Sequence, residues 1–436
     1  MKIAFHTLGC KVNQYETEAM KEQFASAGYE IVNEYDKADV YLINTCSVTG
    51  LADRKSRQYI RKMKKKNPQA VVAVTGCYVQ VSGDEVAAMD EVDIVAGTNE
   101  KNEILNYVNQ HIENRSIGTE KHILDYDQLT DFVECGSITS MESRTRAYVK
   151  IQEGCNRFCS YCIIPFARGP VRSRDVQAVM TECENLVKAG FKELILTGIN
   201  TALCEHLDEI LDRLEKMPGD FRVRLSSLEP TVINAEYVKG LFKYKRLCHH
   251  LHLSLQSGSD NVLKAMNRRY NRNEYLDIVK ALREFDSHYG ITTDIIVGFP
   301  GETEQDFEDS LDIVNRAGFG KVHAFKYSKR KGTAACEMSN QVSPPVKKER
   351  SIRLIEAGER ESKLFIESSI GDVRQVLFEE YDKENQALTG YTDNYIKAYL
   401  KIGEIEAESY KNAFADVRIE NIFADGAQVT LNDKID

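Results

Sequence analysis

The segment EGCNRFCSYCIIPFARG, residues 153–169, places three cysteines within eight positions: Cys155, Cys159 and Cys162. Disulfides use cysteines in pairs, whereas a structural zinc ion or a fully ligated iron–sulfur cube binds four protein side chains. No histidine and no further cysteine lies within ten residues of this group. A cube of four irons held by three thiolates keeps one iron free for a small molecule, and we predict that arrangement here.

A second group of three cysteines follows apolar, β-branched runs near the N-terminus. KIAFHTLGC, DVYLINTC and AVVAVTGC end at Cys10, Cys46 and Cys77, and a helix-like stretch follows each run. Strands that alternate with helices are typical of a parallel sheet, whose strands all end at the same edge. Ligands collect at that edge. The sequence therefore predicts that these three thiols converge, and thiolates suit zinc or iron–sulfur clusters.

The length of 436 residues predicts two or three domains. Residues 1–112 indicate a Rossmann- or flavodoxin-like parallel sheet, and 113–143 a polar connection. Residues 144–370 contain six strand–helix units, which favour a partial (β/α)6 barrel with its catalytic groups at the carboxyl ends of the strands. A doubly wound open sheet is the alternative. Residues 371–436 read as short alternating strands, typical of a small β-barrel.

Charge is unevenly distributed along a chain whose formal net charge is −10. Residues 54–66 contain eight Lys or Arg and no acid, whereas 371–436 contain 14 acids against 7 Lys and Arg. An acidic protein with a local basic patch can bind RNA at a defined place, although such a run also suits a solvated helix face. The predicted RNA-binding residues are Arg54, Lys55, Arg57, Arg61, Tyr391, Tyr395 and Lys397.

The cysteine content and the hydropathy of the chain indicate its cellular compartment. No apolar run approaches the ~20 residues of a membrane-spanning helix, and MKIAFHTLGCKVN does not read as a secretory signal. We therefore expect a cytoplasmic protein with no membrane partner. Eleven cysteines in a reducing compartment favour metal ligation or catalysis over disulfides.

Several motifs together resemble a known family. C-x3-C-x2-C after a predicted strand is the signature of the radical S-adenosylmethionine (SAM) superfamily. The fuller set resembles its methylthiotransferases from residue 1 to about 400. GCKVN and TGYTDNY favour the branch that acts on N6-threonylcarbamoyladenosine at position 37 of tRNA. The segments are HTLGCKVNQYETEAM, NTCSVTGLADRKSRQ, VTGCYVQ, RTRAYVKIQEGCNRFCSYCIIPFARGPVRSR, LHLSLQSGSDNVLKAMNRRY, TDIIVGFPGET and GYTDNYIKAY.

The resemblance implies a domain order, cofactors and a reaction. A methylthiotransferase domain, a radical SAM domain and a C-terminal TRAM domain would follow one another. Cys155, Cys159 and Cys162 would hold a [4Fe–4S] cluster that splits SAM to a 5′-deoxyadenosyl radical. The N-terminal three cysteines would hold an auxiliary [4Fe–4S] cluster for the inserted sulfur. One SAM would supply the methyl group and a second the radical, and a reductant protein such as flavodoxin or ferredoxin would supply electrons.

Residues at predicted strand ends are candidates for SAM binding. Many relatives have Gly-Gly-Glu after the second strand, but this chain has TGIN, with Asn200 in place of the acid. Arg172 and Arg174 suit a carboxylate or phosphate, or an ordinary ion pair. The predicted SAM-binding residues are Gln256, Ser257, Gly258, Asp294, Arg172, Arg174 and Asn200.

Three other functions stay open at this point. Two are enzymatic: methylthiolation of N6-isopentenyladenosine in tRNA, and of an aspartate in a small-subunit ribosomal protein. The third is a non-catalytic, metal-dependent RNA-binding protein in which both cysteine groups are structural. The other cysteines suggest no site and are expected in core or neutral positions. They are Cys135, Cys183, Cys204, Cys248 and Cys336.

Overall fold

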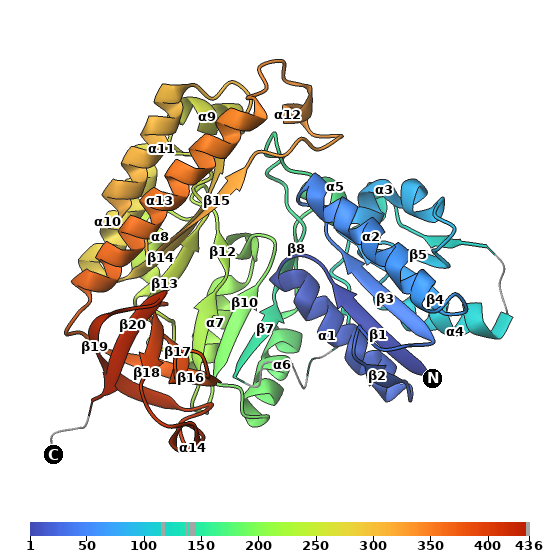
Figure 1. Cartoon of the computed structure of the whole chain (residues 1–436), viewed down its shortest axis with the longest axis horizontal. Helices are drawn as coiled ribbons and strands as arrows, with labels where there is room; N and C mark the ends of the chain where they lie inside the picture. The colour runs from blue at the N-terminus through green and yellow to red at the C-terminus, as the bar shows by residue number, and fades with distance from the viewer. Residues whose placement is uncertain (115–117, 137, 139–144, 433–436) are drawn as a thin grey trace.

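The structure is a computed structural model that describes residues 1–114, 118–136, 138 and 145–432. It contains an N-terminal parallel sheet, a central curved array of strands and a closed C-terminal barrel (Figure 1). The predicted α/β architecture with a small final β-barrel is confirmed. Of the predicted connection, residues 115–117, 137 and 139–143 lie outside the described residues.

The N-terminal sheet is parallel throughout, with strand order β2-β1-β3-β4-β5-β6. Its helices cover both faces: α1 and α4 pack over Phe5 and Leu42, and α2 and α3 over Ile43 and Val74. Every residue of β3 is buried, as expected for a central parallel strand. The elements are β1 (Lys2–Thr7), α1 (Lys11–Ser26), β2 (Glu30–Val32), β3 (Val40–Thr45), α2 (Gly50–Lys66), β4 (Val71–Gly76), α3 (Cys77–Ala87), β5 (Ile94–Ala96), α4 (Ile104–Asn114) and β6 (Glu120–His122).

The short strand β6 extends this sheet into the predicted connection. It pairs with β5 in parallel, with Val95 opposite Lys121. This strand lies at the edge of the sheet, and its side chains are partly exposed. Its sequence EKH therefore lacks the apolar run by which a buried strand is recognised. Pairing with a neighbour, not local sequence, makes this segment a strand.

The central strands form two sheets, β11-β10-β7 and β12-β13-β14-β15, with parallel pairing in both. The predicted strand RVRLSS divides into β11 and β12, and the array bends there. The strands are β7 (Arg146–Lys150), β10 (Glu193–Thr197), β11 (Arg222–Leu225), β12 (Ser227–Leu228), β13 (His250–Leu253), β14 (Gly290–Val297) and β15 (Lys321–Lys326). The short strands β8 (Gln152–Glu153) and β9 (Arg172–Ser173) pair separately. The predicted partial (β/α)6 barrel is confirmed.

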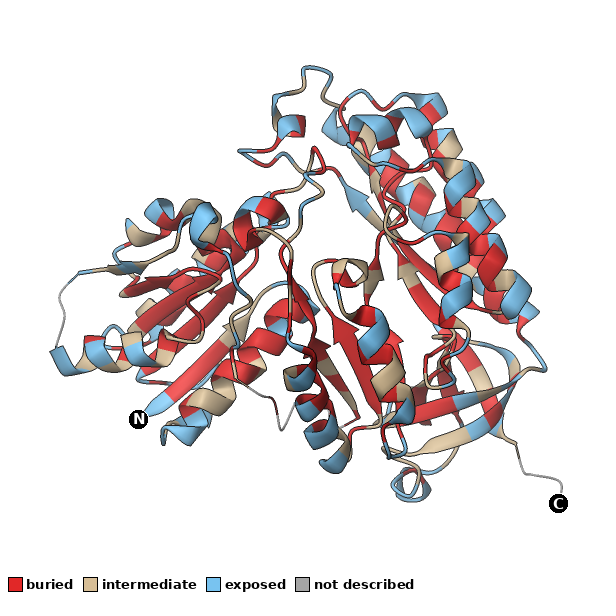
Figure 2. Cartoon of the chain, turned by 180° about the vertical axis from the view of Figure 1, so that it is seen from behind, coloured by how far each residue is buried: buried red, intermediate tan, exposed pale blue. Residues whose placement is uncertain are grey.

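Helices cover the outside of this array, and Figure 2 shows buried strands inside helices with exposed outer faces. At the β7 edge of the array, helix α1 of the N-terminal domain contacts the central strands. The helices are α5 (Ile164–Arg168), α6 (Val176–Lys188), α7 (Leu207–Lys216), α8 (Ala235–Leu241), α9 (Asp260–Ala265), α10 (Arg272–Phe285), α11 (Glu304–Ala317), α12 (Ala334–Glu337) and α13 (Pro344–Ser368). Among the described helices, none is both long and apolar enough to cross a bilayer.

The C-terminal barrel is closed in the order β16-β17-β18-β20-β19. Inward side chains alternate along its strands, and Val376, Phe378 and Leu388 lie in its core. Its elements are β16 (Val373–Asp382), β17 (Ala387–Thr392), β18 (Lys397–Leu400), α14 (Glu404–Ala407), β19 (Phe414–Phe423) and β20 (Gly426–Leu431).

This barrel covers the amino ends of the central strands. Glu193, at the start of β10, pairs with Arg222 at 2.6 Å and with Arg224 at 2.8 Å. Arg222 donates to the Tyr391 carbonyl at 2.9 Å, and the Arg224 guanidinium lies 4.7 Å from the centre of the Tyr395 ring. A ligand can therefore reach the central strands at their carboxyl ends, because the barrel covers their amino ends.

Gly290, the first residue of β14, provides a test of this contact. A Cβ at this position would occupy the space of the Asn394 carbonyl oxygen. We expect Gly290→Ala to lower the free energy of unfolding by about 1–3 kcal/mol, as overpacking does. It should also speed proteolysis between the central domain and the C-terminal barrel. Gly403→Ala, where no atom lies within 4 Å of the added Cβ, is the control. Equal effects of the two variants on unfolding and cleavage would contradict the prediction.

Candidate active site

The central cysteine loop follows β8 and is closed by backbone contacts. Gly154 has a φ of +73°, and a Cβ there would collide with the Pro170 carbonyl, so only glycine fits. The Cys155 amide donates to the Gly169 carbonyl at 3.0 Å, which joins the two ends of the loop. The Ile164 amide donates to the Cys162 sulfur at 3.4 Å. The three thiols Cys155, Cys159 and Cys162 line one cavity of about 320 Å³.

Three of the predicted SAM-binding residues line the same cavity: Asn200, Gln256 and Asp294. Gln256 has a φ of +68°, a conformation that is uncommon for a residue with a side chain. Ser257 and Gly258 turn away from the cavity and pack on α11, where the Gly258 amide donates to the Ser310 hydroxyl at 2.9 Å.

Arg172 and Arg174 do not line the cavity, which corrects the prediction for them. Arg174 pairs with Glu134, which is 40 residues away in sequence, at 2.7 Å and also with Glu182 of the following helix. Arg172 donates to Asn99 at 2.8 Å and to the Arg168 carbonyl at 2.5 Å. Both guanidiniums are buried, and every hydrogen bond that they donate is made within the chain, while the Nε of Arg172 has no partner among the described residues.

After the second central strand, β10, this chain has Asn200 where many relatives have an acid, but an acid from the next part of the strand array lies at the same cavity. Glu229 follows β12 and lines the cavity, where it accepts a hydrogen bond from the Asn200 side-chain amide at 2.8 Å. Arg268 lies 2.9 Å from Glu229, and Arg157 lies 3.3 Å from it. Sequence reasoning missed Glu229 because its segment SSLEP has no recognisable spacing to the cysteines.

The N-terminal thiols follow three neighbouring strands, β1, β3 and β4. Gly9 lies so close to Cys46 that a Cβ on Gly9 would be 3.0 Å from the Cys46 Cβ. Burial raises the pKa of Cys46 to about 12, and the thiols Cys77 and Cys10 add to the shift because they are near it. The predicted convergence of the three cysteines is confirmed as an arrangement of the strands.

Both cysteine groups fit a cationic metal cluster. Burial raises the pKa of Cys155 to about 11 and of Cys162 to about 12, and the neighbouring thiols contribute in each case. Closely packed, buried thiols are costly to ionise alone, whereas a bound metal favours their thiolate form. The set of three soft donors at each place matches an iron–sulfur cube with one open iron.

The chain that follows Cys46 reaches the cavity of the central cysteine group. Val48 and Thr49, just after Cys46, line the same cavity as Cys155. Contacts between the domains hold this arrangement: the Gly50 amide donates to Ser328 at 3.4 Å, and Arg330 pairs with Asp53. The cavity is therefore bounded by the carboxyl ends of both strand arrays.

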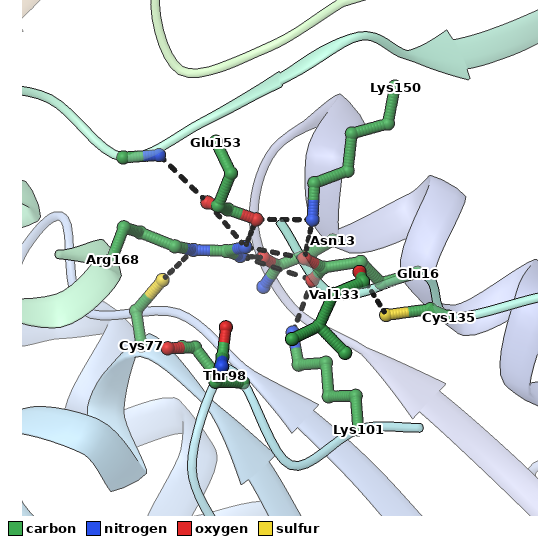
Figure 3. A network of polar contacts seen from close by, with 12 residues as sticks. Asn13, Glu16, Cys77, Thr98, Lys101, Val133, Cys135, Lys150, Glu153 and Arg168 are labelled. Carbon is green, nitrogen blue, oxygen red and sulfur yellow. Dashed lines mark hydrogen bonds and ion pairs between the residues drawn. The ribbon is translucent and has the colours of Figure 1, made fainter. Parts of the chain in front are cut away.

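A buried network of charges lies beside the two groups (Figure 3). Glu16 of α1 is fully buried and contacts three cations, Lys101, Lys150 and Arg168. Arg168 also lies 3.1 Å from Glu153, the last residue of β8. Burial alone would raise the pKa of Glu16, but the three cations hold it well below its ordinary value. The network joins the N-terminal domain to the central loop.

The predicted RNA-binding residues differ in their surroundings. Arg54, Lys55 and Arg61 are exposed on α2, whereas Arg57 donates to the Tyr78 hydroxyl at 2.7 Å. Three lie in the C-terminal barrel: Tyr391 stacks with Tyr395, and Lys397 pairs with Asp425 at 3.1 Å. Both rings also contact arginines of the central strands, and Arg61 lies 3.7 Å from Glu91, so Arg54 and Lys55 are the predicted residues with no such partner in the described part of the chain.

The other predicted cysteines lie apart from these groups. Cys135, Cys183, Cys204 and Cys248 are buried, and Cys336 is partly buried. His250 and His252 each lie 3.0 Å from the Thr292 hydroxyl, so each has a hydrogen-bond partner.

Family models match both of the first two domains. The model described as "Radical SAM superfamily" matches residues 149–314, and "Uncharacterized protein family UPF0004" matches residues 2–97. The chain is 42% identical over 416 residues to "Threonylcarbamoyladenosine tRNA methylthiotransferase MtaB" of Bacillus subtilis, covering 92% of this chain and 90% of the relative. The chain belongs to the radical SAM methylthiotransferases.

Further relatives extend this picture of the methylthiotransferase family. The MtaB protein of Aquifex aeolicus is 38% identical, with 96% of this chain and 100% of the relative covered. A "tRNA-2-methylthio-N(6)-dimethylallyladenosine synthase" of Clostridium tetani is 35% identical, with 92% and 91% covered. The methyltransferase TsrM of Kitasatospora setae shares the fold, with a TM-score of 0.59, 14% identity and 77% of each chain covered. The cofactors of the methylthiotransferases are SAM and two [4Fe–4S] clusters.

Glu16 tests the buried charge network. We expect Glu16→Gln to lower the free energy of unfolding by about 3–5 kcal/mol at pH 7, because it leaves buried cations unpaired. Urea unfolding measures the loss, and Glu113→Gln on the exposed end of α4 should change it by less than about 0.5 kcal/mol.

The pH dependence of that loss follows from the depressed pKa of Glu16. A carboxylate whose pKa is lowered by folding stabilises the protein above its unfolded pKa, about 4.3, and loses this effect only as pH falls through the lower folded value. The difference in the free energy of unfolding between Glu16→Gln and the parent should therefore stay constant from pH 7 to about 5. If this difference disappears by pH 6, the depressed pKa of Glu16 is refuted.

Proposed function

We propose that this protein converts N6-threonylcarbamoyladenosine at position 37 of tRNA to its 2-methylthio derivative. The observation that carries the proposal is one cavity lined both by Cys155, Cys159 and Cys162 and by Val48 and Thr49, which closely follow Cys46 of the second cysteine group. Relatives that cover most of the chain are named for this activity and support the choice of nucleoside. The reaction replaces the hydrogen on C2 of the adenine by a methylthio group.

We assign roles to the residues by their place at the cavity. Cys155, Cys159 and Cys162 would hold the radical SAM cluster, and Cys10, Cys46 and Cys77 the auxiliary cluster. When bound, the clusters and two SAM molecules supply the radical, the sulfur and the methyl group. The chain itself orients SAM through Asn200, Gln256 and Asp294, with Glu229 as a further acceptor for its amino group.

The partners follow from the surface and the chemistry. The exposed cations of α2 adjoin residues 326–331, where the Gly50 amide donates to Ser328, so a basic surface borders the cavity. We propose that this surface binds phosphates of the anticodon stem-loop. Reductive cleavage of SAM needs an electron, and a protein such as flavodoxin or ferredoxin would supply it in the cytoplasm.

Domain roles are part of the same proposal. Residues 1–112 would form the methylthiotransferase domain, 113–143 the connection, 144–370 the radical SAM domain and 371–436 the TRAM domain. The matched family models end within the first and third of these ranges. The closed C-terminal barrel has the architecture expected of the last.

Lys11 supports the threonylcarbamoyl substrate over a neutral one. It directly follows Cys10, and burial together with the Arg224 and Arg146 guanidiniums lowers its pKa, whereas Glu193 and Asp294 on the central strands act in the opposite direction. Those two acids already face other cations or a histidine: Arg222 and Arg224 pair with Glu193, and His252 lies 3.2 Å from Asp294. Among the described residues, no carboxylate forms an ion pair with Lys11.

An ammonium that lies near two guanidiniums and forms no ion pair with a described carboxylate favours an anionic ligand. The threonylcarbamoyl group carries a carboxylate, whereas the dimethylallyl group of the other relatives' nucleoside is uncharged and apolar. We propose that Lys11 pairs with the carboxylate of the threonyl group.

Nucleoside mass spectrometry of tRNA tests the function. In a bacterium lacking the activity, we expect the chain and its Cys183→Ala variant to produce 2-methylthio-N6-threonylcarbamoyladenosine. Cys155→Ala should produce none, because it removes a ligand of the radical cluster, whereas Cys183 lies in the apolar core. Sulfur appearing only on the isopentenyl nucleoside would overturn the substrate, and sulfur on neither would overturn the tRNA assignment.

Lys11→Met tests the recognition of the carboxylate. With anticodon stem-loops bearing the threonyl group as carboxylate or as neutral amide, the parent should bind the carboxylate at least tenfold more tightly, as expected for a charge-assisted contact of about 1.5 kcal/mol or more. Fluorescence anisotropy should show this preference lost in Lys11→Met. Lys55→Met, on the exposed face of α2, should weaken both RNAs equally. A preference that survives Lys11→Met would refute the role of Lys11.

A further inference from the structure

Arg168 makes a contact that none of the roles above explains. It is the last residue of α5, six positions after Cys162, and its side chain is fully buried. Its Nε donates to the sulfur of Cys77 at 3.1 Å (Figure 3). Cys77 begins α3 in the other domain, and α3 contacts α5. A cation of the radical SAM loop therefore lies against a thiol of the auxiliary group.

The guanidinium has little freedom to turn away from that sulfur. Its Nη1 contacts Glu16 at 2.5 Å and Glu153 at 3.1 Å, and its Nη2 donates to the Asn13 amide oxygen at 2.5 Å. These contacts occupy the other side of the planar group and leave Nε toward Cys77. Arginine keeps its proton in proteins, so the charge beside the sulfur is permanent.

A fixed cation and an N–H donor at a cluster thiolate have a known physical effect. Hydrogen bonds to the sulfurs and the local charge set the potential of an iron–sulfur cluster. Reduction adds a negative charge, which the guanidinium stabilises more strongly at low dielectric than in water. Glu153 opposes this effect because its carboxylate lies against the same guanidinium.

We propose that Arg168 is a positioning residue that raises the reduction potential of the auxiliary cluster through its hydrogen bond to Cys77. The inference rests on the proposed assignment of that cluster to Cys10, Cys46 and Cys77. The Glu153 carboxylate acts in the opposite direction and lowers the potential, so the potential depends on the balance of the two charges. The same side chain thereby links the loop of one cluster to a ligand of the other.

The test uses the full chain with Cys155, Cys159 and Cys162 replaced by alanine, so that only the auxiliary cluster can load. Its midpoint potential is measured by EPR-monitored redox titration, with iron analysis of each sample. We expect Arg168→Met to lower the equilibrium constant for reduction about tenfold, which is about 59 mV for one electron. Glu153→Gln keeps Arg168 and removes the opposing charge, so it should raise the potential.

Shifts of opposite sign separate an electrostatic role from a structural one, because structural damage predicts no such pattern. Arg172→Lys is the matched control: Arg172 is also buried but donates to Asn99 and to backbone carbonyls, and the variant keeps the charge. Its potential should equal that of the parent.

Each result decides the proposal. Loaded Arg168→Met with the parent's potential would overturn it. If Arg168→Met loads no iron, Glu153→Gln decides: a rise supports the proposal, and no change or a fall overturns it. A parent that loads no iron would refute the assignment of the auxiliary cluster to these cysteines, and the inference with it.

Discussion

The buried guanidinium of Arg168 is the interaction on which the relative placement of the two cysteine groups depends. Burying such a charge costs several kcal/mol unless it is paired and hydrogen-bonded. Its partners come from both domains: Glu16 from α1 beside the N-terminal sheet, and Glu153 from the strand that leads into Cys155. A shift of either domain would leave a buried charge unpaired. The interface therefore has one arrangement, and in it residues that closely follow Cys46 line the cavity of the central cysteines.

The six cysteines and the three-part fold were predictable because their signals are local. An apolar run followed by a cysteine gives a strand end, and the shared edge of a parallel sheet gives convergence without any distance. Glu229 and the pairing of Arg174 with Glu134 were not predictable, because their partners lie far along the sequence. Arg172 and Arg174 follow the cysteine loop as a ligand-binding arginine would. Only the packed structure shows that Arg174 and the terminal nitrogens of Arg172 donate to partners within the chain.

The aromatic residues of the C-terminal barrel are a second case in which the sequence did not predict the partners of a side chain. Tyr391 and Tyr395, with a nearby lysine, have the composition of a surface that stacks bases. In the structure Arg146 lies 5.0 Å from the Tyr391 ring centre and Arg224 lies 4.7 Å from that of Tyr395. A ring stacks on an arginine of its own chain by the same physics as on a base. Sequence alone does not decide between the two, and here the rings close the amino ends of the central strands.

The closure of one end has an electrostatic consequence for RNA. The acidic residues of 371–432 lie on the barrel at the amino ends of the central strands, while the cations of α2 adjoin residues 326–331 at the carboxyl ends. A polyanion approaching this molecule is repelled from one end and attracted to the other. The net charge of −10 therefore does not oppose RNA binding but directs it. The end that attracts RNA is the end at which the cavity of Cys155, Cys159 and Cys162 lies.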